Sequence, residues 1–295
     1  MGNFQDALSE TADAVTATLK RLLPKGDGPE SRVFDAMGYA TLNGGKRLRP
    51  FLVLSGASLF DVPRDRALRV SVAAEFVHCY SLVHDDLPAM DDDDLRRGLP
   101  TCHIEYDEAT AILTGDALLT HAFEILSDPA THPTATVRCE LIQAMAAAIG
   151  AHGMVGGQMF DLRAGEMDLD IGAITRLQQM KTGALIAYSC EAGAILGRAR
   201  EAERQALRMY AHDVGLAFQI ADDLLDEEGT EEEVGKKVGK DAAAGKATFV
   251  SLLGVERARA QAHMLSDQAA KHLDLFGEKA DLLREVARYI VERRA

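Results

Sequence analysis

Two aspartate clusters constrain the fold of this chain more than any other feature of its sequence. The first contains Asp85-Asp86 and Asp91, and the second is Asp222-Asp223-Leu224-Leu225-Asp226. Apolar residues precede both clusters, which predicts that each lies at a buried helix face. Crowded carboxylates repel one another, so a fold retains two such clusters most readily when a shared counter-charge lies between them. Mg²⁺ prefers carboxylate oxygens and keeps positions free for water or phosphate, so the clusters predict a metal and phosphate site.

The spacing within each cluster indicates how its carboxylates meet. Asp222 and Asp226 are one helical turn apart and share a helix face. Pro88 lacks an N–H and its ring crowds the preceding turn, so Asp85 and Asp91 can converge across a bulge instead of a regular helix. The run Asp92–Asp94 also fits an exposed acidic face or a helix N-cap, and both interpretations stay open for it.

Helical periodicity dominates the rest of the chain, and strand patterns are nearly absent. The Asn43-Gly44 pair lacks the flanking alternation of a hairpin. Several predicted helices are apolar on more than one side, which is typical of the interior of a large bundle. No linker, repeat or low-complexity tract divides residues 1–295, so we expect one all-α domain. The predicted helices are Phe4–Leu22, Pro29–Leu42, Leu48–Leu59, Arg64–Asp86, Glu105–Leu126, Thr134–Ile149, Gly172–Leu196, Glu201–Asp226, Thr248–Ser266 and Lys279–Arg294.

Composition excludes several classes of protein. The chain has 295 residues, of which 46 are acidic and 32 basic, and the net charge of −14 argues against binding nucleic acid. Four cysteines without a C-x-x-C pair indicate reduced thiols and a cytoplasmic location. Residues 1–20 carry acidic side chains and lack the apolar region of a signal peptide. No apolar run approaches the roughly 20 residues of a membrane span, so we expect no membrane insertion.

Basic residues follow glycines or aspartates at several places. Gly44-Gly45-Lys46-Arg47-Leu48-Arg49-Pro50 places cations and backbone N–H groups before a helix, a pattern that binds anions. Arg96-Arg97 directly follows the first acidic cluster and supplies charge for a phosphate whose other oxygens bind metal. Lys181-Thr182-Gly183 interrupts an apolar helix, and Lys236 and Lys246 flank a glycine-rich loop. Each lysine alone is more often a solvated surface residue, and its position relative to the aspartates makes it a candidate.

These motifs, in this order, resemble those of the trans-prenyltransferases, the short-chain isoprenyl diphosphate synthases. Three further motifs support the resemblance: Gly156-Gly157-Gln158-x-x-Asp161, Phe218-Gln219 and Gly245-Lys246-Ala247-Thr248. The resemblance covers about residues 40–255, and within the family it is strongest to the bacterial farnesyl diphosphate synthases. It implies an all-helical, isoprenoid synthase-like bundle around a deep central cavity. It also implies a homodimer and three Mg²⁺ ions per active site.

The resemblance further implies a role for each matching residue. Metal binding or its support falls to six aspartates: Asp85, Asp86, Asp91, Asp222, Asp223 and Asp226. Arg96, Lys181 and Lys236 hold the allylic diphosphate, and Lys46, Arg49, His78 and Arg97 hold isopentenyl diphosphate. The carbonyl of Thr182 and the side chain of Gln219 face the developing cation, and Lys246 and Arg293-Arg294 help to close the site.

The implied reaction condenses isopentenyl diphosphate with dimethylallyl diphosphate and then with geranyl diphosphate. Metal and cations stabilise the charge of the leaving diphosphate, and an apolar pocket excludes water from the allylic cation. The departing diphosphate takes the proton, because no His or Glu is clearly placed as a base. For His78 and His84, hydrogen bonding to phosphate outweighs a role as general base.

The residues before the first cluster predict product length. Tyr80 precedes Asp85 by five residues, so its ring lies roughly 7–8 Å deeper along the helix, beside Ser81. One isoprene unit is comparable to a helical turn of about 5 Å, so an aromatic floor there stops growth after two or three units. This predicts (2E,6E)-farnesyl diphosphate as product. A core Tyr80 that points away from the cavity stays open as an alternative.

Three other functions compete with this interpretation. A geranylgeranyl diphosphate synthase is the nearest rival among enzymes. A terpene cyclase would not need the second diphosphate site at Lys46 and Arg49. A non-catalytic subunit or an acidic cation-binding protein belongs to a different class, but such a subunit usually loses an aspartate motif and both are intact here.

Overall fold

The computed structural model describes residues 2–228 and 248–292. Helices make up nearly all of their regular structure, which confirms the predicted all-α class. The described residues fall into two compact units. The first comprises Met1–Leu54 and Val62–Ile142, and the second comprises Ser55–Asp61 and Gln143–Ala295. One domain with a central cavity stays a prediction.

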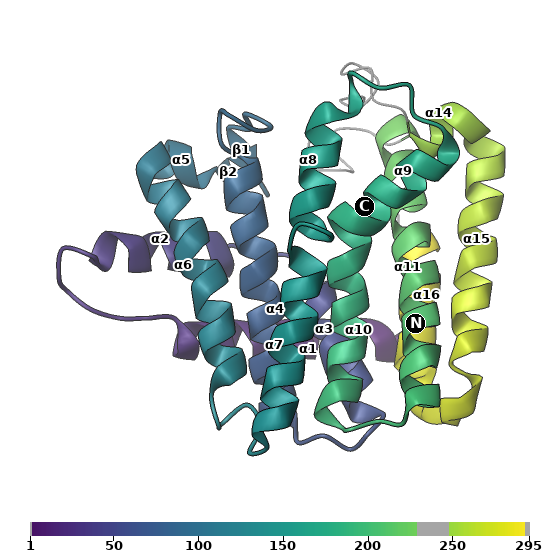
Figure 1. The fold of residues 1–295 in the computed structure, drawn as a ribbon, viewed down its shortest axis with the longest axis horizontal. Coiled ribbons are helices and arrows are strands. Elements are labelled where there is room, and N and C mark those ends of the chain that lie inside the picture. Colours follow the sequence, from purple (N-terminus) through teal and green to yellow (C-terminus); the bar gives the residue numbers. More distant parts are fainter. Residues whose placement is uncertain (1, 229–247, 293–295) are drawn as a thin grey trace. The chain divides into compact units, whose positions relative to one another are not determined.

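The first unit is built around the α4–α6 pair, whose helices run side by side (Figure 1). Most side chains of α4 between Ala67 and Val83 are buried, as the apolar pattern of this helix predicts. A core cluster of Ala36, Val83, Leu87, Cys102 and Ala111 lies near the aspartate end of α4. The helices of this unit are α1 (Gly2–Leu22), α2 (Ser31–Leu42), the start of α3 (Leu48–Ser58), α4 (Arg64–Asp85), α5 (Cys102–Glu105), α6 (Glu108–Ser127) and the start of α7 (Ala135–Ile149).

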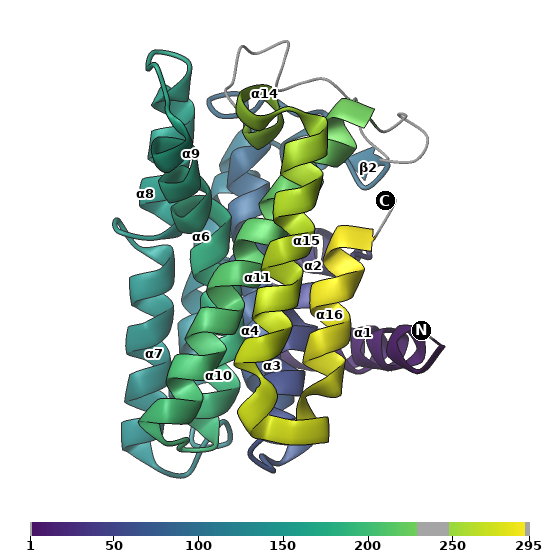
Figure 2. The ribbon, with the colours of Figure 1, turned by 90° about the vertical axis from the view of Figure 1, so that its right-hand side faces the viewer.

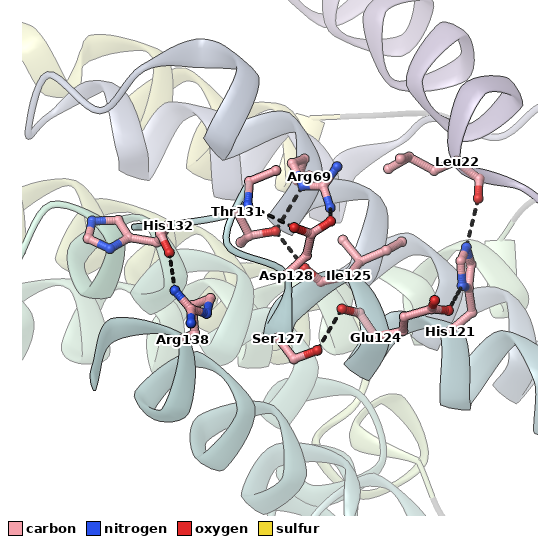
Figure 3. Close-up of polar contacts among 11 residues, drawn as sticks. Leu22, Arg69, His121, Glu124, Ile125, Ser127, Asp128, Thr131, His132 and Arg138 are labelled. Atoms are coloured by element: carbon pink, nitrogen blue, oxygen red, sulfur yellow. Dashed lines mark hydrogen bonds and ion pairs between the residues drawn. The ribbon is translucent and has the colours of Figure 1, made fainter. Parts of the chain in front are cut away.

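Polar contacts tie these helices together at the opposite end of α4 (Figure 3). Arg69 of α4 donates hydrogen bonds to Thr131 Oγ1, at 2.9 Å, and to the carboxylate of Asp128, just beyond α6. His121 of α6 bonds the carbonyl of Leu22, at 2.7 Å, where α1 ends. The two helices that flank the first aspartate cluster are therefore fixed at their distant ends.

A short hairpin between α4 and α5 was not predicted. Its strands β1 (Leu95–Arg96) and β2 (Leu99–Pro100) pair antiparallel. The turn residues Arg97 and Gly98 both have positive φ, 54° and 77°. Two-residue turns of this kind usually carry Asn-Gly or Gly-Gly, because both positions lie in the left-handed region. An arginine at the first position gives no such signal in the sequence.

The second unit is a helical layer structure in which α11, α15 and α16 pack together (Figure 2). The sequence did not predict α8, and a five-residue π-helical turn interrupts the predicted helix Gly172–Leu196. Gly254, with φ 77°, breaks the predicted helix Thr248–Ser266. The elements of this unit are the ends of α3 and α7, α8 (Met154–Ala164), α9 (Ile171–Gln178), the π-turn η1 (Gln179–Gly183), α10 (Ala184–Leu196), α11 (Glu201–Glu228), α14 (Phe249–Leu253), α15 (Val255–His272), the 3₁₀ segment η2 (Asp274–Ala280) and α16 (Asp281–Glu292).

No helix in the described ranges is long and apolar enough to cross a membrane.

Candidate active site

The first aspartate cluster begins where α4 ends, at Asp85. The chain then turns through Pro88, and the amide of Asp91 donates to the carbonyl of Asp85, at 2.9 Å. The amide of Asp92, with φ 50°, donates to the carbonyl of Leu87. This turn returns the backbone of Asp91 to the end of α4, in agreement with the bulge expected from the sequence.

Asp86 is buried and holds Arg96. The Nε atom of Arg96 donates to Asp86 Oδ1 at 2.8 Å, and the same guanidinium lies 3.9 Å from Asp93. Burial raises the pKa of Asp86 above its usual range, and the hydrogen bonds from Arg96 act in the opposite direction. The structure thus brings a predicted metal-supporting residue and a predicted diphosphate ligand into direct contact.

The glycine-rich loop Gly44–Pro50 is anchored by Arg47, which sequence reasoning counted only among its cations. Arg47 has φ 49°, is almost fully buried, and donates both to Glu75 of α4 and to the carbonyl of Thr41, at 2.6 Å. A buried guanidinium in an ion pair serves as an anchor, and Lys46 and Arg49 lie on either side of it. The missed signal was Glu75, a charge within the apolar run Ala73–Val77 that needs a buried partner.

Arg97 joins the hairpin to this loop. Its Nη1 atom donates to the carbonyl of Gly44, and its guanidinium packs on Gly45. A Cβ atom on Gly45 would lie 2.7 Å from the guanidinium carbon, and Gly45 has φ 108°, so only glycine suits this position. The two basic motifs of the first unit are therefore neighbours.

His78 lies among these cations. Arg49 Nη1 is 3.4 Å from His78 Nε2, and because a guanidinium only donates, Nε2 must accept as part of a neutral ring. Burial and the charges of Arg49, Arg97, Arg96 and Arg47 lower the pKa of His78 well below 6.5. Three of the predicted isopentenyl diphosphate ligands, Arg49, His78 and Arg97, thus lie in one electropositive region, which suits an anion.

The two residues predicted to set product length lie on α4. Tyr80 is buried, with 6% of its surface exposed, and burial and the charge of Asp85 raise its pKa to about 12. Its ring contacts the ring of His84, with centroids 5.9 Å apart. Ser81 donates its hydroxyl back to the carbonyl of His78, at 2.9 Å.

The second unit contains a cavity of about 180 Å³ that is lined by six of the predicted site residues. Residues 219, 222, 223 and 226 of α11 follow helical spacing and share one wall, and η1 supplies the opposing residues. The predicted site residues that line the cavity are Lys181, Thr182, Gln219, Asp222, Asp223 and Asp226.

The π-turn η1 places Lys181 and Thr182 in this cavity, and α8 supports it. Asp161 of α8, itself in the cavity wall, accepts a hydrogen bond from Lys181 Nζ at 2.7 Å. Gly157 allows the approach, since a Cβ atom there would lie 2.3 Å from the backbone nitrogen of Lys181. Single π-turns inside α-helices occur often at functional sites. Sequence reasoning noted the motif of Gly157 and Asp161 but gave it no role.

A second contact holds η1 from α11. Gln179 Nε2 lies 2.7 Å from His212 Nε2, and His212 Nδ1 lies 3.1 Å from Asp213. Asp213 is buried, and its other oxygen bonds His272 of α15, at 3.1 Å. Nothing in the sequence indicated this chain of contacts.

Asp223 has a structural partner at the edge of the cavity. Its Oδ2 atom accepts from the backbone nitrogen of Phe249, at 2.8 Å, and thereby caps the start of α14. Thr248 caps the same helix through the amide of Ser251 and also lines the cavity. Lys236, Lys246 and Arg293-Arg294, which were also predicted to act here, lie outside the described residues.

The residue types of both clusters suit Mg²⁺. Among residues 2–228 and 248–292, no group of three or more His, Cys, Asp or Glu side chains is arranged to hold a metal ion. Mg²⁺ is usually bound by one or two carboxylates, with water and substrate phosphate completing its shell. Asp222 and Asp226 on one cavity wall offer such oxygens, and so does the turn that carries Asp85 and Asp91.

The helical fold and the order of these acidic and basic motifs define the class of protein to which the chain belongs. The chain belongs to the polyprenyl synthetase family, whose model matches residues 30–286. This confirms the resemblance to the trans-prenyltransferases.

Three relatives show how far the similarity extends. The farnesyl diphosphate synthase of Escherichia coli is 42% identical, and the alignment covers 99% of each chain. The geranylgeranyl diphosphate synthase of Cyanophora paradoxa is 40% identical over 99% of this chain and 97% of its own. An FPP/GFPP synthase from Zymomonas mobilis, known from its crystal structure, is 51% identical in sequence. Its structure matches this one with a TM-score of 0.89, over 98% of this chain and 99% of the other.

The lowered pKa of His78 predicts a loss of stability in acid. Below about pH 6.5 the unfolded chain binds a proton at this histidine more readily than the folded protein does. The free energy of unfolding therefore decreases as the pH is lowered. Between pH 7 and pH 5, the free energy of unfolding measured by chemical denaturation should decrease more for the wild type than for His78→Gln, by no more than about 2 kcal/mol, the limit set by the ordinary histidine pKa of about 6.5. His152→Gln, at an exposed position, is the control and should follow the wild type. Parallel curves for wild type and His78→Gln would contradict the assignment.

The contact between Asp161 and Lys181 predicts a second effect on stability. Asp161→Asn leaves a partly buried ammonium without its carboxylate, and should lower the free energy of unfolding by about 1–3 kcal/mol. Asp168→Asn, at an exposed position after α8, should change it by less than about 0.5 kcal/mol. Urea denaturation measures both. Equal values for the two variants would show that the pair contributes nothing.

Proposed function

We propose that this protein is a farnesyl diphosphate synthase. It condenses isopentenyl diphosphate with dimethylallyl diphosphate and then with geranyl diphosphate, and releases (2E,6E)-farnesyl diphosphate and diphosphate. The similarity to farnesyl diphosphate synthases over the full chain, with both aspartate motifs retained, carries the proposal. Further farnesyl diphosphate synthases are 39–41% identical to this chain, which adds support.

Two sets of basic residues bind the two diphosphates in this proposal. Isopentenyl diphosphate is held by Lys46, Arg49, His78 and Arg97, of which the last three lie in the electropositive region of the first unit. With Nε2 of His78 accepting from Arg49, Nδ1–H is the donor that the ring presents to a phosphate oxygen. Arg96, Lys181 and Lys236 hold the allylic diphosphate. Asp86 and Asp161 fix the first two of these cations in place.

The carboxylates of both motifs hold magnesium in this proposal. Asp85 and Asp91 belong to one motif and Asp222 to the other, with Asp86, Asp223 and Asp226 in support and three ions per site. When bound, Mg²⁺ neutralises the charge that develops on the departing diphosphate. The aspartates orient these ions, and the buried Asp223 also keeps α14 in place.

Carbon–carbon bond formation needs groups that tolerate a cation without attacking it. The carbonyl of Thr182, presented by the π-turn, and the side chain of Gln219 line the same cavity and fill this role. Both offer partial negative charge without a strong nucleophile, which favours the allylic cation. The departing diphosphate accepts the proton, and Lys246 and Arg293-Arg294 close the site.

Product length is the point on which relatives differ. A geranylgeranyl diphosphate synthase, the rival function, is 40% identical, close to the 42% of a farnesyl diphosphate synthase. The proposal that the product is the shorter one therefore rests on Tyr80. Its ring is buried on α4, more than one helical turn before Asp85, as a floor requires. The homodimer, Mg²⁺ as the metal in the cell and the cytoplasmic location stay predictions.

The function is tested by product analysis. Purified protein with Mg²⁺, dimethylallyl diphosphate and labelled isopentenyl diphosphate should yield mainly farnesol after dephosphorylation and chromatography. Excess EDTA should abolish diphosphate release, and added Mg²⁺ should restore it, because the carboxylates alone cannot neutralise the leaving group. Mainly geranylgeraniol would favour the rival synthase. No prenol at all would favour a binding protein.

Tyr80 should limit product length directly. Tyr80→Ala or Tyr80→Met removes the aromatic floor and should shift the product from C15 to C20 or longer in the same assay. Cys79→Ala, which truncates the preceding buried residue, should keep C15 as the main product. A Tyr80→Ala variant that still stops at C15 would refute the floor assignment.

A further inference from the structure

His84 is a half-buried residue at the end of α4 that the proposed reaction does not use. It lies one helical turn after Tyr80 and directly before Asp85. Its ring meets the ring of Tyr80 edge to face, with centroids 5.9 Å apart and planes at 80°. Side chains on a helix lean toward its N-terminus, so the His84 ring covers the turn that carries Tyr80.

A second contact fixes His84 to the neighbouring helix. Its Nε2 atom lies 3.0 Å from the carbonyl of Ile112 on α6. A carbonyl only accepts, so Nε2 carries the proton and donates it to α6. This bond takes the Nε2 proton of His84 away from phosphate binding, the role that its sequence position suggested.

Gly115 makes room for this arrangement. A Cβ atom there would lie 2.0 Å from His84 Nε2, closer than any real contact. α6 therefore carries a glycine at the one place where the imidazole enters between the helices. The imidazole of His84 is thus held by α6 at Ile112 and Gly115, and the same imidazole contacts the ring of Tyr80.

We propose that His84 is a positioning residue that sets product length by holding the Tyr80 ring across the path of the growing chain. The inference rests on the proposed function and on Tyr80 as the floor. An aromatic side chain has few rotamers, and one edge-to-face contact of ordinary strength changes their populations about two- to ten-fold. Loss of the His84 ring therefore lets Tyr80 leave the path often enough to admit a longer product.

Product chain length after incubation with dimethylallyl and labelled isopentenyl diphosphate tests this inference, because a purely structural role would not shift it. His84→Gln can keep a bond to Ile112 but lacks a ring, and should raise the ratio of C20 to C15 about two- to ten-fold. Gly115→Ala should raise it as well, because the added methyl group displaces His84. His84→Phe keeps an aromatic neighbour for Tyr80 and should shift the ratio less than His84→Gln.

A matched control comes from the other histidine that ties α6 to a carbonyl. His121→Gln removes a ring that contacts Phe76 of α4 and disturbs the bond to Leu22, but it leaves the contact between Tyr80 and His84 in place, so it should keep the C15 pattern even where thermal stability falls. Tyr80→Ala is the reference for a removed floor. If circular dichroism shows that His84→Gln does not fold, the product of Gly115→Ala tests the inference instead, since this variant keeps His84 in the sequence.

The outcomes separate this inference from the proposed function. A wild type that forms no prenol overturns the proposed function. A wild type that forms farnesol, with Tyr80→Ala extended and both His84→Gln and Gly115→Ala unchanged at C15, overturns the role of His84 alone. Longer products from these two variants, with C15 from His121→Gln, support it.

Discussion

Buried carboxylates hold three basic side chains of this protein in fixed places. Glu75 holds Arg47, Asp86 holds Arg96 and Asp161 holds Lys181, each from a helix next to the segment that carries the cation. A charge removed from water is stable only with a close partner, so each pair defines where its cation lies. The basic groups are thus oriented before any anion arrives, which is the condition for strong electrostatic stabilisation.

Close contacts also hold backbone conformations in the first unit that would otherwise be unfavourable. Arg47, Asp92 and Arg97 all have positive φ, and each lies in or beside a motif of the first unit. Such residues persist only where their surroundings determine them, and they occur often at functional sites. Arg47 is held by Glu75 and Thr41, and Arg97 by its bond to Gly44. Side-chain contacts therefore shape the loops that present Lys46 and Arg49.

The sequence predicted most of the helices and both aspartate motifs because burial imposes a helical period on apolar residues. It did not predict α8, whose Gly156 and Gly157 weaken helix formation. The structure gives the reason for Gly157, which lets α8 approach the π-turn closely. The anchoring role of Arg47 was not predicted, because a loop arginine beside glycines gives no sign of burial. Its partner Glu75 is 28 residues away, a pairing that only the fold reveals.

Helix α4 combines two tasks that the proposed reaction requires to be at a set distance. Its last residue, Asp85, belongs to the first aspartate cluster, and Tyr80 lies on the same rigid element. Helical rise alone sets their separation along the axis at about 7.5 Å. The distance from diphosphate to floor therefore cannot be adjusted by moving the helix, because both ends would move together. In the proposed reaction, product length therefore depends on the side chain at position 80 and on what holds it, and that support comes from His84 and the glycine of α6.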